Sequence, residues 1–136
     1  GQFRYEDSQR ELQSTTAEYF DREGLLLTRG QVRMKSRDGG IEMRGDTLNL
    51  YEVGEGRTDD RVDVTGLPAF ASIQPSDATE GVDEKGPYEV RALRLRFEGE
   101  GLLFGDGEVE VDRDSLHATT MSLSFDRNLG NLILVF

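Results

Sequence analysis

The sequence predicts an elongated all-β structure in which one β unit is stacked several times. Two recurring patterns and the glycine content predict this fold. The 16 glycines against 3 prolines suit a chain with many short turns. One pattern is a glycine followed by apolar residues two and four positions later: Gly30, Val32 and Met34; Gly66, Pro68 and Phe70; Gly107, Val109 and Val111. The other places apolar or small residues at offsets 0, 2, 4, 7 and 9: Ile41, Met43, Gly45, Leu48 and Leu50; Tyr88, Val90, Ala92, Leu95 and Phe97; Leu116, Ala118, Thr120, Leu123 and Phe125.

The spacing has a direct physical meaning. Successive side chains of a strand point to opposite faces, so a period of two makes one face apolar. The step of three between offsets 4 and 7 breaks this alternation, and a bend or bulge there returns the later apolar residues to the same interior. Gly45, Ala92 and Thr120 occupy that corner in the three copies. A single copy cannot bury its apolar face alone, so stacking on neighbours must complete the core.

The elements follow in chain order. Residues 1–16 are polar and are expected as a separate N-terminal segment, frayed or forming a short helix, before a domain that spans 17–136. Residues 17–21 are expected as the tail of a degraded fourth copy. Strands are expected at 25–37, 40–51, 61–74, 88–97, 102–112, 115–125 and 129–136, and an exposed acidic loop at 75–87.

Composition narrows the functional classes. With 136 residues, one domain with a substantial core is expected. The absence of cysteine excludes disulfides and thiolate metal sites. A net charge of −11 argues against a nucleic-acid partner, because a phosphate backbone requires clustered Lys and Arg. The sequence has neither a signal peptide nor a transmembrane helix pattern.

Several segments together resemble a known family. They are the glycine unit at 30–34, the segment 41–51, the segment 62–74 and the segment 92–97, with Gly66-Leu67-Pro68-Ala69-Phe70 as the most specific piece. This set is similar to the OstA-like domain of the lipopolysaccharide-transport family, which occurs in LptA, LptC and LptD. The resemblance implies a single elongated β-jellyroll of stacked antiparallel strands with an apolar interior groove.

The resemblance also implies a function. The expected protein is non-enzymatic, uses no cofactor and shields the acyl chains of lipopolysaccharide or a related lipid between the inner and outer membranes. It would be periplasmic, either free there or held at the inner membrane by a segment outside this sequence. Its other expected partners are further OstA-like domains joined head to tail. LptA-like and LptC-like identities both remain open.

The inward positions of the repeats predict the groove. Acyl chains buried there would gain about 0.8 kcal/mol per methylene. The alternative is that these side chains fill a closed β-sandwich core. The candidate groove residues are Met34, Met43, Leu48, Leu50, Phe70, Leu95, Phe97, Val109, Val111, Leu123 and Phe125.

The residues that alternate with the apolar set predict partner edges. An early strand carries basic residues and a late strand carries acidic ones, so charge could order subunits or partners that join by edge-strand addition, including copies of this chain. The alternative is an ordinary solvated face on each strand. The apolar C-terminal run is expected as a closing core strand or a covered edge. The candidate edge residues are Arg29, Arg33, Lys35, Glu108, Glu110, Asp112, Leu132 and Leu134.

Catalytic and metal sites are not expected. His117 is the single histidine and is expected on the surface, without a serine elbow to serve. The acidic residues Asp77, Glu80, Asp83 and Glu84 lack the spacing of a calcium loop. Two other classes remain as alternatives: a structural adaptor that joins partner proteins through its β edges, and a carbohydrate-binding β domain, which the absence of Trp disfavours.

Overall fold

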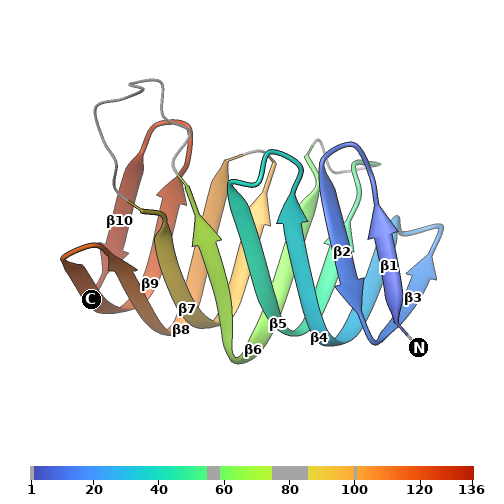
Figure 1. Cartoon of the computed structure of the whole chain (residues 1–136), viewed down its shortest axis with the longest axis horizontal. Helices are drawn as coiled ribbons and strands as arrows, with labels where there is room; N and C mark the ends of the chain where they lie inside the picture. Colours follow the sequence, from blue (N-terminus) through green and yellow to red (C-terminus); the bar gives the residue numbers. More distant parts are fainter. Residues whose placement is uncertain (1, 55–58, 75–85, 100) are drawn as a thin grey trace.

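A computed structural model describes residues 2–54, 59–74, 86–99 and 101–136. These residues form one antiparallel sheet of ten strands, in the order β1-β2-β4-β5-β6-β7-β8-β9-β10, with β3 also paired to β4 (Figure 1). The all-β prediction is therefore confirmed. The strands are β1 (Phe3–Glu6), β2 (Arg10–Ser14), β3 (Thr16–Phe20), β4 (Leu25–Ser36), β5 (Ile41–Tyr51), β6 (Arg61–Ile73), β7 (Tyr88–Glu98), β8 (Leu102–Arg113), β9 (Leu116–Asp126) and β10 (Asn131–Val135).

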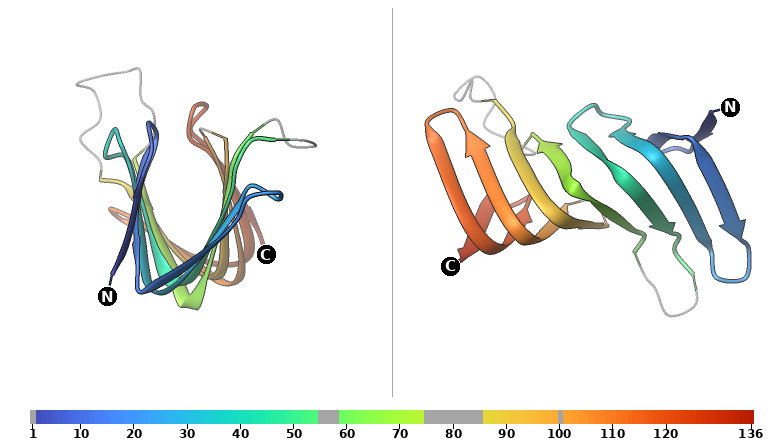
Figure 2. Two further views of the ribbon diagram at one scale, coloured as in Figure 1. Left: turned by 90° about the vertical axis from the view of Figure 1, so that its right-hand side faces the viewer. Right: turned by 90° about the horizontal axis from the view of Figure 1, so that it is seen from below.

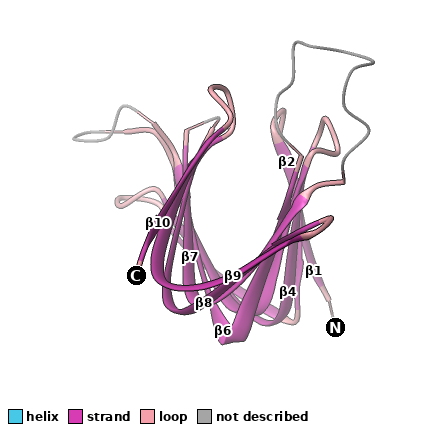
Figure 3. Cartoon of the chain, turned by 90° about the vertical axis from the view of Figure 1, so that its left-hand side faces the viewer, coloured by secondary structure: helices cyan, strands magenta, loops and turns pink. Residues whose placement is uncertain are grey.

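The sheet is folded lengthwise into two facing walls. Seen along the long axis, every long strand bends near its middle, so the ribbon has a V-shaped section with a closed corner and an open edge (Figures 2 and 3). We call the open edge the mouth. Wall A contains β2 and residues 32–36, 41–45, 69–73, 88–92 and 109–113. Wall B contains β3 and residues 25–29, 47–51, 61–65, 94–98 and 102–106.

The corner is made by irregularities in the strand register. β4 has an extra residue between Arg29 and Val32 where it passes β5, and β8 has one between Asp106 and Val109 where it passes β9. Gly30 and Gly107 have φ of 86° and 85° there, a conformation that glycine adopts without a steric penalty. The step of three in β5, β7 and β9 lies opposite these sites, so the predicted corner is confirmed.

The close approach of β6 to the corner of β5 is a steric reason for glycine at position 45. A Cβ atom there would lie 2.6 Å from the carbonyl oxygen of Thr65 and 2.6 Å from a methyl carbon of Val64. These contacts are too short for real atoms, so the corner of β5 needs a residue without a side chain for β6 to approach this closely.

The space between the walls is filled by side chains. The buried apolar side chains between the walls are 0–5% exposed, from Leu12 near one end of the sheet to Phe125 near the other. Tyr88 of wall A contacts Phe125 of wall B, with 4.9 Å between ring centroids. The described inner side chains therefore form one buried hydrophobic cluster, and lipid binding between the walls stays a prediction.

The N-terminal expectation is wrong. Residues 3–6 and 10–14 are strands β1 and β2, not a frayed segment or a helix, and Leu12 is fully buried. β2 and β3 together form a fourth copy of the repeat, with Arg10, Leu12, Ser14, Ala17 and Tyr19 at offsets 0, 2, 4, 7 and 9. Because the residues at offsets 0 and 4 of this copy are polar, the hydrophobic spacing predicts only its tail, at 17–21.

The C-terminal run lies at an edge of the sheet, which is one of its two expected places, and is not a closing core strand; cover by a partner stays a prediction. β10 pairs only with residues 122–126 of β9, and its burial alternates along the strand. Leu132 and Leu134 are half-buried against the core, whereas Ile133 and Val135 are 59% and 52% exposed. β10 is therefore an edge strand with one apolar face toward solvent, not a strand buried on both faces.

Candidate functional site

The candidate groove residues, apart from Phe70, lie on the inner faces of the two walls. They are 0–5% exposed and come from five strands, so the repeat correctly predicts which side chains face inward. Wall A contributes Met34, Met43, Val109 and Val111, and wall B contributes Leu48, Leu50, Leu95, Phe97, Leu123 and Phe125.

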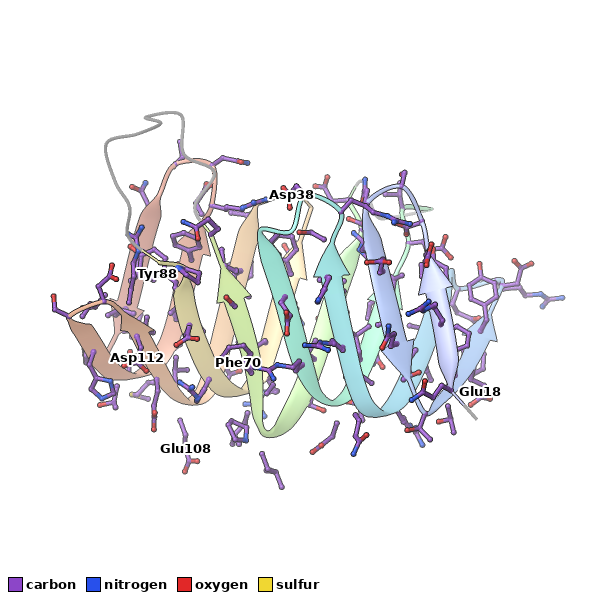
Figure 4. The ribbon with its side chains drawn as sticks, in the orientation of Figure 1. Glu18, Asp38, Phe70, Tyr88, Glu108 and Asp112 are labelled. Atoms are coloured by element: carbon purple, nitrogen blue, oxygen red, sulfur yellow. The ribbon has the colours of Figure 1, made fainter. Side chains whose placement is uncertain are left out.

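Phe70 is a correction. β6 spans five residue steps between Thr65 and Phe70 where β5 spans three, and this bulge reverses the alternation in the second half of β6. Ala69 and Ala71 face inward instead, and Phe70 lies on the outer face (Figure 4). There the guanidinium of Arg44 lies 4.4 Å from its ring centroid and that of Arg91 lies 5.4 Å away. The ring therefore has cation–π contacts in place of a core position.

A cavity of about 380 Å³ opens at the mouth, between the two walls. Its apolar lining comes from Met34 and Ile41 of wall A and Phe97 of wall B, all part of the buried core. Its polar lining includes Arg10, Arg37 and Arg127 and also Asp38. The cavity therefore combines charged residues of both signs with an apolar lining.

Two ion pairs among the described residues join the walls across this mouth. Arg10 at the rim of wall A donates from Nη2 to the Asp60 carboxylate at the rim of wall B, at 2.6 Å. Arg127 at the rim of wall B donates from Nη2 to Asp38 of wall A at 3.2 Å and from Nε to the Gln74 carbonyl at 2.8 Å. We call them the cross-mouth ion pairs; Figure 4 shows Asp38 at the open edge.

Hydrogen bonds hold the Asp38 carboxylate in its charged form. The hydroxyl of Ser36 and the backbone N–H of Gly40 donate to Asp38 and lower its pKa, and the charge of Arg127 lowers it further. Asp38 and Asp60 therefore have different surroundings: the side chain of Asp38 is 59% exposed, whereas that of Asp60 is 15% exposed.

Asp7 and Tyr5 extend the polar rim beside Arg10. Burial raises the pKa of Asp7, but backbone N–H groups of Gln9 and Arg10 donate to its carboxylate and bring the net pKa below its usual value. Burial, followed by the hydrogen bond to Asp7, raises the pKa of Tyr5 to about 12. Tyr5 therefore stays a neutral hydrogen-bond donor at physiological pH.

Sequence reasoning did not identify the residues of the cross-mouth ion pairs. Arg10 offered one signal, because it is a charged residue at an inward position of the fourth repeat copy. Asp38, Asp60 and Arg127 lie in turns just outside the strands, where no periodicity marks them.

The charged candidate edge residues do not lie at edges, which corrects that expectation. Arg29, Arg33 and Lys35 belong to β4, which β2 and β3 cover on one side and β5 on the other. Glu108, Glu110 and Asp112 belong to β8, which lies between β7 and β9. Several charged residues of these strands form ion pairs with residues on a neighbouring strand, as in Arg33–Glu42, Arg91–Asp112 and Arg94–Asp106.

The actual edges lie at the two ends of the sheet. β1 and β3 form one end, and β10 with the first half of β9 forms the other, where no described strand pairs beyond residues 116–121. This second end carries apolar residues that are largely exposed: Leu116 (41%), Met121 (70%), Ile133 (59%) and Val135 (52%). Leu132 and Leu134 do belong to an edge strand, but their side chains face the core.

His117 is exposed, as expected, and its Nδ1 lies 2.5 Å from the Asp112 carboxylate. The hydrogen bond to Asp112, then its charge and that of Glu110, raise the pKa of the imidazole. Because the pKa of His117 is raised in the folded state, its pairing with Asp112 stabilises the fold below about pH 6.5, and this contribution is lost as pH rises through the folded-state pKa.

Asp112→Asn should lower the His117 pKa in an NMR titration. Glu110→Gln, the control, should lower it less, and an equal shift in both would contradict the assignment.

The described residues contain no group of three or more His, Asp or Glu side chains placed to hold a metal ion. Asp77, Glu80, Asp83 and Glu84 lie outside the described residues. Within the described part of the chain, no helix is long and apolar enough to cross a membrane.

Comparisons with known proteins bear on the fold. No family model matches the chain, and no curated protein matches it in sequence. Among solved structures, it matches LptH from Pseudomonas aeruginosa, described as the LptA homologous periplasmic component of the conserved lipopolysaccharide transport device. The TM-score is 0.77 at 17% identity, covering 92% of this chain and 80% of that one. The expected fold is therefore confirmed: the chain is a single antiparallel sheet that resembles the LptA β-jellyroll.

Proposed function

We propose that this protein is a periplasmic, non-enzymatic carrier that shields the acyl chains of lipopolysaccharide or a related lipid between the inner and outer membranes. The observation that carries the proposal is the folded sheet itself, because two walls present continuous apolar faces to each other along its length. The fold shared with LptH, a periplasmic component of a lipopolysaccharide transport device, supports the same function.

The closed core defines how such a carrier would work. The inner side chains pack against one another, so an acyl chain must separate the walls and replace contacts such as Tyr88–Phe125. Each buried methylene contributes about 0.8 kcal/mol toward that separation. The mouth is the proposed route, because the corner is held by continuous backbone whereas the described residues join the walls at the mouth through side chains. The sugar head of the lipid would stay in water, and the domain itself would supply no driving force.

The end strands would connect the carrier to its neighbours. The unpaired first half of β9 and the exposed apolar face of β10 are suited to edge-strand addition by another OstA-like domain or a second copy of this chain. The same observation favours the alternative function, a structural adaptor that keeps its core closed and joins partner proteins through these edges.

Photo-crosslinking separates the carrier from the adaptor. A photoreactive residue at Leu50, Phe97 or Phe125, all on the inner face, should crosslink to lipopolysaccharide. The same residue at Arg33 or Glu110, on outer faces of inner strands, should give only background labelling. Labelling at none of the three interior positions would rule out the carrier and leave the adaptor.

A further inference from the structure

The arginines that line the mouth cavity are paired with carboxylates. Arg10 pairs with Asp7 and Asp60, and Arg127 pairs with Asp38. A guanidinium group that a carboxylate holds beside an apolar lining can exchange that carboxylate for another anion.

Two of these arginines are unusually well buried. The side chains of Arg10 and Arg127 are 9% and 13% exposed, and each is oriented by more than one acceptor. Arg37 differs, since its side chain is 43% exposed and it pairs with Glu6 outside the mouth. Buried guanidinium groups are costly to desolvate unless an anion faces them, and here that anion comes from the opposite wall.

Resting on the proposed carrier function, we propose that the mouth cavity binds the anionic group of an amphiphile, with Arg10 and Arg127 exchanging Asp60 and Asp38 for the oxygens of that group. The planar fork of arginine suits phosphate and carboxylate oxygens alike. Directly below the rim, Met34, Ile41 and Phe97 offer an apolar surface to the first methylenes of an attached chain.

The exchange couples binding of the head group to opening of the walls. Each arginine and its carboxylate partner come from different walls, so a ligand that takes over the arginine releases one cross-mouth connection. The anionic group would replace one ion pair of each arginine with another, so neither guanidinium group is left without a partner during opening. A neutral head group cannot make this exchange.

Probes of equal chain length test the inference. Dodecyl phosphate, dodecyl maltoside and inorganic phosphate would be compared by calorimetry with the full chain, below the critical micelle concentration of each detergent. We expect dodecyl phosphate to bind about tenfold more tightly than dodecyl maltoside, and inorganic phosphate to bind weakly because it lacks an apolar chain. Tight binding of inorganic phosphate alone would overturn the assignment to an amphiphile.

Variants assign the effect to the two arginines. Arg10→Gln combined with Arg127→Gln should lower dodecyl phosphate affinity about tenfold and leave dodecyl maltoside affinity unchanged. Asp60→Asn or Asp38→Asn should instead raise dodecyl phosphate affinity, because the arginine loses its competing carboxylate from the opposite wall. Arg33→Gln, an exposed outer-face arginine paired with Glu42, is the matched control and should change neither affinity.

The outcomes separate this inference from the carrier proposal. If both detergents bind equally and the arginine variants change nothing, the anionic site is overturned and the carrier stands. If neither detergent binds, the carrier itself is overturned. Should Arg10→Gln fail to fold because Asp60 is left buried, the pair Arg10→Gln with Asp60→Asn keeps a neutral hydrogen-bonding pair there and must still abolish the preference for phosphate.

Discussion

Linking the two walls covalently at the mouth is expected to abolish lipid uptake. Asp38→Cys and Arg127→Cys place thiols on opposite walls, at positions whose native side chains already meet at 3.2 Å. The chain has no cysteine of its own, so a short reducible bifunctional thiol reagent would react only there. Because the interior is filled, walls that cannot separate leave no room for an acyl chain.

The measurement is binding of dodecyl maltoside before linking, after linking and after reduction. This neutral probe avoids any effect of removing Arg127. A matched control joins Glu42→Cys to Ser72→Cys, which are register partners on adjacent strands of wall A, and should leave binding intact. Undiminished binding after a complete cross-mouth link would contradict uptake between the walls.

Leu95→Ala is expected to lower the free energy of unfolding by about 2–5 kcal/mol, the range for truncating a fully buried leucine. Leu95 is 1% exposed and lies on the inner face of wall B, between Val64 of β6 and Gly105 of β8. The lost methyl groups forfeit burial, and the surrounding strands cannot collapse fully into the space because the ladder fixes their spacing.

Urea unfolding measures this effect, and Leu67→Ala provides a control with the same chemical change. Leu67 is 87% exposed in the bulge of β6, so its truncation should change stability by less than about 0.5 kcal/mol. Similar losses for both variants would show that the inner face is not the main source of stability.

The sequence predicted the fold where local rules act on single strands. A period of two fixes which face of β5, β7 or β9 is apolar, and the step of three located their bends, so Leu48 and Phe97 were placed inside correctly. Phe70 was misplaced because its face depends on how many residues the 66–68 bulge of β6 inserts relative to β5. The spacing of the apolar residues alone does not predict the number of inserted residues.

The cross-mouth ion pairs could not be predicted from the sequence, for a different reason. Arg10 and Asp60 are 50 residues apart, and Arg127 and Asp38 are 89 apart. Their meeting depends on the fold angle of the whole sheet and on which strand of one wall faces which strand of the other. The charged candidates that the sequence offered, such as Arg33 and Glu110, followed from alternation within one strand and therefore belonged to the outer surface.

The bulges that bend the strands lie side by side along the corner, and this alignment has a consequence for cooperativity. Because adjacent strands are joined by hydrogen bonds on both sides of the corner, one strand cannot widen its angle without carrying its neighbours with it. An acyl chain that separates the walls at one position therefore lowers the cost of separating them at the next. A lipid with several chains would gain more affinity than the sum of its chains, so the sheet would discriminate lipids by chain number.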